Sequence, residues 1–252
     1  MKKNLLIALA MCVLLAGPSA KAATITSSTT LPTVGLEDVA QLNAPTSDAE
    51  NILGTGTTTT GTNDAATYVA NDRLTQGQTF TTGADPKGYT LNGIWVQHVG
   101  YTTVVTNGTW ASLADGAAVT VRIVDPSKTD TAAFVLRSEV ATVATGNGFS
   151  GGIGSSPWWG GTGNWLYIAL ATPITLAANT QYGFDLTSNS PWFELAGLEA
   201  GPYAGGAAYT TTAKVALNMG TVRVDGDRTF VVDMAPVLHY MTPANDPKGK
   251  TP

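Results

Sequence analysis

The stretch AAVTVRIVD, residues 117–125, alternates apolar and polar side chains. One face of it would carry Val119, Val121 and Ile123, and the other Thr120 and Arg122. Successive side chains of a β-strand point to opposite faces, so this pattern predicts a half-buried strand. Turn signals enclose it, because Asp115-Gly116 comes before it and Asp125-Pro126 comes after it. The fold is therefore expected to bury one side of such strands.

Similar runs recur along the chain, separated by residues typical of turns. They include YTLNGIWVQHV (89–99), NWLYIALATPITL (164–176), QYGFDLTS (181–188) and RTFVVDMAPVL (228–238). No run has the periodicity of an amphipathic helix. Abundant threonine and glycine also favour strands and turns. We expect an all-β domain over residues 67–238, an antiparallel β-sandwich resembling a jelly roll, followed by a flexible tail at 239–252.

The chain begins with features of a secretory signal peptide. Two lysines, Lys2 and Lys3, precede an apolar stretch from Leu5 to Ala16, and small residues flank Lys21. The apolar stretch is too short for a stable membrane span, so we predict a signal peptide over residues 1–22 that is cleaved after Ala22. The protein is then secreted, with a periplasmic or cell-surface location as the alternative, and no later stretch would insert into a membrane.

Cleavage would also change the chemistry available to the protein. It removes Cys12, the only cysteine, and with it any disulfide or thiolate site. Three of the 13 basic residues and none of the 18 acidic residues are lost, which leaves a net charge near −8. An acidic chain without a basic run is not expected to bind nucleic acid or anionic membranes. The sequence specifies no oligomeric state.

Residues 23–66 differ from the rest. They are rich in threonine, serine, asparagine and glycine, most of all in GTGTTTTGTND (54–64). We expect an irregular lead-in with one early strand and a short helical turn near GLEDVAQL (35–42). A disordered linker is the alternative.

Several segments resemble a known kind of domain. They are YVANDRLTQGQTFTTG (68–83), LATPITLAANTQYGFDLTS (170–188) and DGDRTFVVDMAPV (225–237). Together they resemble a recurring β-sandwich domain of secreted environmental bacterial proteins, similar to carbohydrate-binding modules, that often accompanies a Pro-Glu-Pro sorting tail. The resemblance covers residues 67–237 and implies a jelly-roll-like fold and an extracellular location, without defined catalytic residues. No such tail precedes Pro252, so free secretion is expected rather than covalent anchoring.

Aromatic residues provide the candidate binding site. In SSPWWGGTGNW (155–165), three tryptophans stand among small residues, and alternation would turn further rings away from the core. The predicted ligand-binding residues are Trp95, Gln97, Trp158, Trp159, Trp165, Tyr167, Trp192 and Glu194. Flat rings can stack on the C–H face of a sugar, and Asn164 and Asp185 would add polar groups nearby. The alternative is that Trp158 and Trp159 fold over the sheet as a second small core.

These features predict a secreted, non-catalytic protein that binds an extracellular polysaccharide or another glycan. One alternative is a structural or assembly protein of the cell envelope or matrix, which Thr-rich strands and low charge would suit. The other is a glycoside hydrolase that uses Asp185 and Glu194, because glycosidases need two carboxyl groups and these lie on successive predicted strands.

A structural calcium ion is the metal to consider. Asp225-Gly226 favours a tight hairpin, and Asp225, Asp227 and Asp233 would lie around it. The alternative is that Asp225 shapes the turn and Asp227 pairs with an arginine. No other cofactor is expected, because His98 and His239 are too few for a histidine zinc site. GFSGG (148–152) matches the serine-nucleophile pattern, but no helical segment follows it, so we interpret it as coincidental.

Overall fold

The structure is a computed structural model of the chain. It describes residues 21–42, 47–51, 75–98, 115–148, 164–188, 194–198, 203–211, 216–223 and 226–237. Residues 1–20 of the predicted signal peptide and the predicted tail at 239–252 lie outside these ranges. In the ranges given, no helix is long and apolar enough to cross a membrane.

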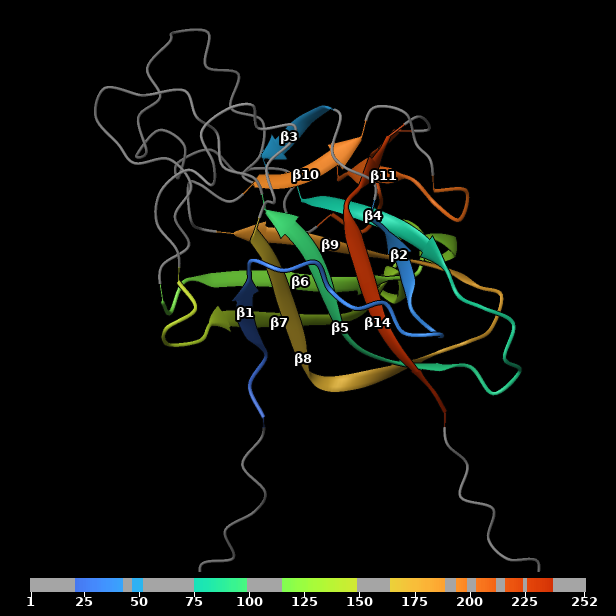
Figure 1. The fold of residues 1–252 in the computed structure, drawn as a ribbon. Coiled ribbons are helices and arrows are strands. Elements are labelled where there is room, and N and C mark those ends of the chain that lie inside the picture. The colour runs from blue at the N-terminus through green and yellow to red at the C-terminus, as the bar shows by residue number, and fades with distance from the viewer. Residues whose placement is uncertain are drawn as a thin grey trace, which may run out of the picture.

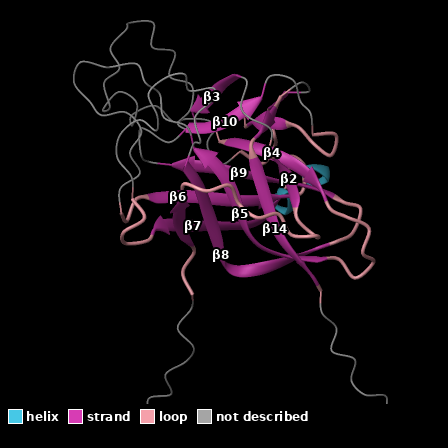
Figure 2. Cartoon of the chain, viewed as in Figure 1, coloured by secondary structure: helices cyan, strands magenta, loops and turns pink. Residues whose placement is uncertain are grey.

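The described part of the chain is built from strands, which confirms the predicted all-β class (Figure 2). Its helices are two 3₁₀ turns, η1 (Pro126–Lys128) and η2 (Ala132–Phe134). The strands form a 14-stranded hydrogen-bonded sheet. This sheet is mixed rather than purely antiparallel, because β1 (Thr24–Ser28) runs parallel to β7 (Val135–Val143). The jelly-roll-like sandwich stays a prediction.

The strands nearest the viewer in Figure 1 form what we call the front layer. In hydrogen-bonded order it contains β1, β8 (Asn164–Leu176), β5 (Tyr89–His98), β14 (Phe230–Pro236) and β2 (Val39–Gln41). All these pairs are antiparallel. The rows of side chains on β1, β8 and β5 are aligned, since Ile25 and Ile94 both lie opposite Ile168.

The strands behind them form the rear layer and run across the front layer at a steep angle (Figure 1). In order it contains β12 (Thr221–Arg223), β11 (Ala208–Thr210), β4 (Gln76–Thr81), β9 (Gln181–Ser188), β6 (Ala118–Val124) and β7. Strand β6 occupies most of the stretch 117–125, as the alternation of that stretch predicts.

Strand β1 joins the two layers. Thr24 lies opposite Thr142 of β7 and also opposite Ala169 of β8. The predicted lead-in thus supplies strands to the sheet, and β3 (Ser47–Asn51) is another. The prediction of a helical turn near residues 35–42 is wrong. A hydrogen-bonded turn from Gly35 to Asp38 leads instead into strand β2.

The main core lies between the layers. The front layer contributes Ile25, Ile94, Val96, Leu166, Ile168, Phe230 and Val232, and the rear layer contributes Phe80, Val119, Val121, Ile123, Phe184 and Leu186. All of these side chains are buried. The apolar side of the pattern in residues 117–125 points into this core, so the alternation identifies the buried face correctly.

Two further strands extend the sheet beside β5. Strand β10 (Glu194–Leu198) pairs with β5, β3 and β13 (Asp227–Arg228). The hairpin predicted at Asp225-Gly226 does not form as expected, because β12 pairs with β11 whereas β13 pairs with β10. Between these strands the chain passes from one part of the sheet to another.

An exposed carboxylate closes the turn after β7. Asp115 accepts hydrogen bonds from the backbone N–H groups of Gly146, at 2.7 Å, and Gly148, at 2.6 Å. These two bonds, from Gly146 first and then Gly148, lower the pKa of the Asp115 carboxyl. The turn also positions Asn147, whose side-chain oxygen accepts a hydrogen bond from the Ser27 N–H of β1.

Replacing Ile168 with alanine tests the core. The side chain is fully buried between Ile25 and Ile94, so Ile168→Ala should lower the free energy of unfolding by about 2–5 kcal/mol. Val140, with 59% of its surface exposed, is the matched control. Val140→Ala should change the free energy by less than about 0.5 kcal/mol. Urea unfolding measures both, and equal effects would contradict the assignment of this core.

Asp115 should contribute a pH-dependent part of the stability. Its pKa is lower in the folded chain than in the unfolded chain. The contribution is therefore complete above the unfolded value, about 4, and is lost as the pH falls through the lowered folded value. Thermal melting of Asp115→Asn and the wild-type protein between pH 6 and pH 2 should give midpoints that differ most at pH 6 and converge in acid. A constant difference would contradict the mechanism.

Candidate functional site

Two aromatic rings lie together on the outer face of the front layer, the face turned away from the core. Trp95 of β5 and Tyr167 of β8 are directly opposite each other in the ladder. Their ring centroids are 4.8 Å apart and their planes are inclined by 33°. Both side chains are partly exposed. Leu166 and Ile168 point into the core, and alternation therefore places Tyr167 on the opposite face, as the sequence predicts.

A glycine and a carboxylate hold the tyrosine. The Tyr167 ring lies over Gly93, where an added Cβ atom would approach the ring to 2.7 Å. Its hydroxyl donates a short hydrogen bond to the Asp233 carboxylate on β14. Burial raises the pKa of Tyr167, and the hydrogen bond and charge of Asp233, together with the charge of Asp38, raise it further. The hydroxyl is therefore a neutral hydrogen-bond donor.

The rest of the predicted binding surface is less open. Trp165 lies on the same face as Tyr167 but is only 3% exposed, so the expectation of an exposed ring at this position is wrong. Gln97 lies opposite Trp165 in the ladder and is 6% exposed. Alternation assigns a side chain to a face, but it does not show what covers that face. Of the four predicted binding residues on β5 and β8, Trp95 and Tyr167 are partly exposed, whereas Gln97 and Trp165 are buried.

The remaining predicted binding residues are three tryptophans and Glu194. Trp158, Trp159 and Trp192 lie outside the described residues. Glu194 begins strand β10, where it pairs with Asn51 of β3. His98 ends strand β5 opposite Asn164. The proposed role of the loop tryptophans, as a platform or as a second core, stays a prediction.

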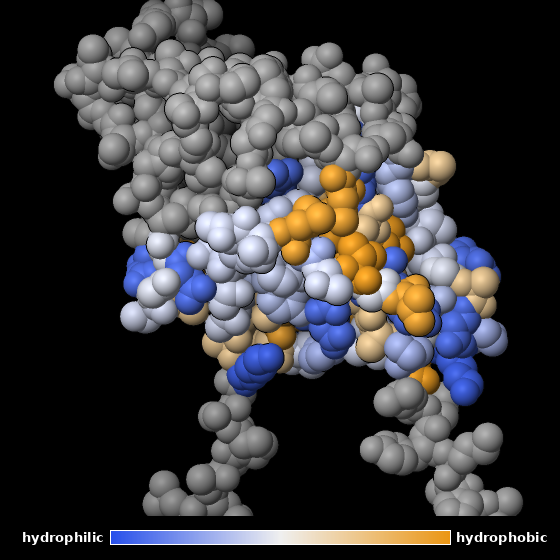
Figure 3. Space-filling model, in the orientation of Figure 1, coloured by the Kyte–Doolittle hydropathy of each residue, from blue (hydrophilic) through white to orange (hydrophobic). Residues whose placement is uncertain are grey.

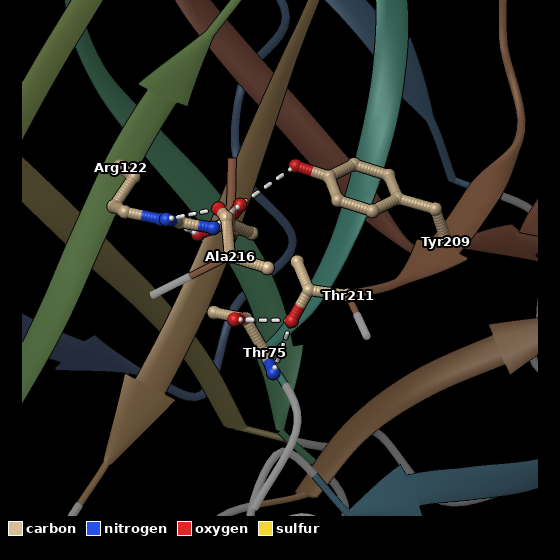
Figure 4. Close-up of polar contacts among 6 residues, drawn as sticks. Thr75, Arg122, Tyr209, Thr211 and Ala216 are labelled. Carbon is tan, nitrogen blue, oxygen red and sulfur yellow. Dashed lines mark hydrogen bonds and ion pairs between the residues drawn. The ribbon is translucent and has the colours of Figure 1, made fainter. Parts of the chain in front are cut away.

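A buried polar cluster occupies the outer face of the rear layer. Two guanidinium nitrogens of Arg122 donate to the two carboxylate oxygens of Asp185, at 2.7 and 2.8 Å. The Tyr209 hydroxyl donates to Asp185 at 2.9 Å. The third Arg122 nitrogen donates to the backbone oxygen of Ala216, at 2.9 Å, so this cluster also holds the chain that covers it. Figure 4 shows Arg122 and Tyr209 approaching the same point from different strands.

Burial dominates the electrostatics of this cluster. It raises the pKa of Asp185, although Arg122 and Tyr209 act in the opposite direction. Burial and the neighbouring Asp185 charge raise the pKa of Tyr209. The guanidinium stays charged and has no acceptor atoms, so the carboxylate facing it supplies the counter-charge. The cluster is a buried ion pair to which a neutral phenol donates a hydrogen bond.

The expectation that Asp185 is a polar group beside the aromatic rings is wrong. The side chain is fully buried, so it does not flank the aromatic rings as an accessible polar group. Strand β9, which carries it, lies between β4 and β6, whereas β10 with Glu194 lies beside β5. The two residues are therefore not on neighbouring strands, and the predicted hydrolase pair gains no support.

The aspartates proposed for calcium have separate protein partners. Asp227 is buried, where it accepts hydrogen bonds from the Gln78 side chain at 2.9 Å and the Tyr203 N–H at 2.8 Å. Burial raises the pKa of Asp227 against these two bonds. Asp233 bonds to Tyr167, and Asp225 lies outside the described residues. Within the described ranges, no group of three or more His, Cys, Asp or Glu residues could hold a metal.

The partners of these groups could not be identified from the sequence. Tyr209 and Ala216 lie far along the chain from Arg122, and no local pattern connects them. Asp38 was also missed, although the turn that precedes β2 brings its charge near Tyr167. An isolated arginine in a strand, on the face opposite the core, was the one available signal for a buried ion pair.

Comparisons with known proteins add no assignment. No family model, curated protein or solved structure matches this chain.

Neutralising Asp185 should destabilise the fold strongly. Asp185→Asn leaves the Arg122 charge buried without its counter-charge, which should lower the free energy of unfolding by about 3–5 kcal/mol. The control is Arg137→Gln, which removes a half-exposed partner 3.8 Å from Glu139. That variant should lose no more than about 1 kcal/mol. Urea unfolding at neutral pH compares the two, and a small effect of Asp185→Asn would show that the cluster is not an ion pair.

Proposed function

We propose that this is a secreted, non-catalytic protein that binds a glycan through Trp95 and Tyr167. The observation that carries the proposal is the pairing of these two partly exposed rings on one face, with hydrogen-bonding groups beside them. The predicted signal peptide supports the extracellular location, and the acidic composition is compatible with an uncharged ligand.

The chemistry of the pair suits a sugar. A pyranose ring has C–H faces that pack on aromatic rings and hydroxyl groups at its edge that need hydrogen-bond partners. Trp95 offers apolar ring surface together with an indole N–H donor. The Tyr167 hydroxyl and the Asp233 carboxylate that accepts from it are polar groups beside the rings. One small patch therefore combines both kinds of contact.

A hydrolase is a weaker candidate on these observations. One of its two proposed carboxyl groups, Asp185, is buried and held by Arg122 and Tyr209. Next to the aromatic pair, the described carboxylates already accept hydrogen bonds, Asp233 from Tyr167 and Asp38 from backbone N–H groups. Such groups suit ligand orientation better than proton transfer.

Affinity electrophoresis tests the proposal. The wild-type protein should migrate more slowly in native gels that contain one or more of a panel of soluble polysaccharides, including neutral glucans, xylan and mannan. Trp95→Ala should abolish the retardation, because it removes the exposed ring, whereas Trp95→Phe should retain part of it.

Val140→Ala serves as the control, because Val140 is exposed on β7, a strand of the other layer. It should leave the retardation unchanged. The proposal fails if no polysaccharide slows the wild-type protein, or if Trp95→Ala is slowed as much as the wild type.

A further inference from the structure

The connection between β1 and β2, residues 29–38, crosses the face that carries the aromatic pair. We call it the strap. Strands β8, β5 and β14 lie between β1 and β2 in the front layer. Four strand spacings amount to about 19 Å, which a ten-residue segment can span. The core fills the inner face, so the strap must take the outer one, and Figure 1 shows it in blue, passing in front of β5 and β14.

The strap is packed loosely on the sheet. Its largest apolar side chains point into solvent, with Leu31 60% exposed, Val34 41% and Leu36 fully exposed. The surface seen in Figure 3, which has the orientation of Figure 1, carries a group of apolar side chains on this face. Pro32 is buried and forms one anchor. The strap therefore gains little from burying its own side chains.

At its start the strap bonds to the end of β1, where the Ser28 hydroxyl contacts Thr30. Beyond that turn, one hydrogen bond among the described residues joins the strap to the sheet. The backbone N–H of Met234 donates to Oδ1 of Asp38 at 2.8 Å. The other Asp38 oxygen accepts from the Gly35 N–H at 2.6 Å, which holds the end of the strap in its turn. The last β2–β14 pair is Val39 with Val232, so Asp38 continues the contact where the ladder stops. We call the Asp38–Met234 bond the clasp.

The clasp lies next to the residue of β14 that holds Tyr167. Met234 follows Asp233, which accepts the hydrogen bond from Tyr167. Asp38 is close enough for its charge to contribute to the raised pKa of Tyr167. Movement of the strap would therefore change the surroundings of the pair directly.

We propose that the strap gates access to the Trp95–Tyr167 pair, and that the clasp keeps it closed over that face. The identity of the ligand rests on the proposed function, but the opening of the strap can be measured without any ligand. When the closed form predominates, the apparent affinity for a ligand falls in proportion to the open fraction. Breaking the clasp should raise that affinity by the same factor as it raises the open fraction.

Asp38→Ala breaks the clasp, and Asp38→Asn is its matched variant, because the amide oxygen can still accept from Met234. Collisional quenching of Trp95 fluorescence by acrylamide reports access. Subtracting the signal of the same protein with Trp95→Phe isolates this residue from the other five tryptophans among the six in the chain. Amide hydrogen exchange of Gly35 and Met234 reports the clasp itself.

In Asp38→Ala, faster exchange of both amides and stronger quenching of Trp95 are expected. Asp38→Asn should keep Met234 exchange and Trp95 quenching close to the wild type, whereas the Gly35 amide, which then faces the side-chain NH2 group, should exchange faster. Asp125→Ala is the control, because Asp125 accepts hydrogen bonds within a distant turn, from Ser127. It should alter none of these readouts. A thermal melt of each variant establishes that the fold is retained, and Pro32→Ser provides a second way to loosen the strap.

The outcomes separate the gate from the ligand. Unchanged Trp95 quenching in folded Asp38→Ala and in Pro32→Ser overturns the gate, whatever the gels show. Stronger quenching with weaker polysaccharide retardation also overturns it, since the strap would then be part of the binding surface. Stronger quenching with stronger retardation supports it. If no polysaccharide retards either the wild type or Asp38→Ala, the glycan proposal fails, while the quenching result still decides whether the strap covers the pair.

Discussion

The inward orientation of the apolar rows on the front layer is the constraint from which the other features of this protein follow. Leu166 and Ile168 of β8 point into the core together with Ile94 and Val96 of β5. Strand geometry then places their neighbours Tyr167 and Trp95 on the other face. The ladder register brings these two rings opposite each other. Because the core fills the inner side, the β1–β2 connection is left with the outer side as its path. The aromatic pair and the strap above it are therefore consequences of one packing arrangement.

The two outer faces are closed in different ways. On the rear layer, Arg122 and Asp185 form a buried ion pair, and the same guanidinium holds Ala216 of the covering chain. Opening that cover would break the hydrogen bond that the charged Arg122 guanidinium donates to the Ala216 backbone oxygen. On the front layer, the strap is joined by a hydrogen bond at Asp38 and by one buried proline. These few contacts contribute little free energy, so the strap can open while the rest of the protein stays folded. The contrast explains why we place binding on the front face.

Alternation in the sequence predicted which face each strand buries, but not which outward residues remain exposed. In residues 117–125 and in 164–170 the assignment to faces agrees with the structure, because the period of two is a local property of a strand. Trp165 was predicted on the correct face, yet it is buried. Asp185 likewise lies on the face opposite the core, where Arg122 of the neighbouring strand β6 and Tyr209 of β11 cover it. Exposure depends on contacts between segments far apart in the chain, which local patterns do not encode. The strand β2 was missed because three residues are too few to show a period.

The position of β1 has a consequence for how the chain acquires its fold. Thr24 finds its neighbours in Thr142 and Ala169, so the earliest strand to be synthesised waits for partners made much later. Contacts this distant in sequence slow folding, because a large loop must close before any ladder forms. Strand β1 has neither of its partners until β7 has been synthesised, and it cannot join the two layers until β8 follows. The junction between the two layers therefore depends on a strand that is made long before either of its partners, and it can form only after synthesis has passed Leu176, the end of β8.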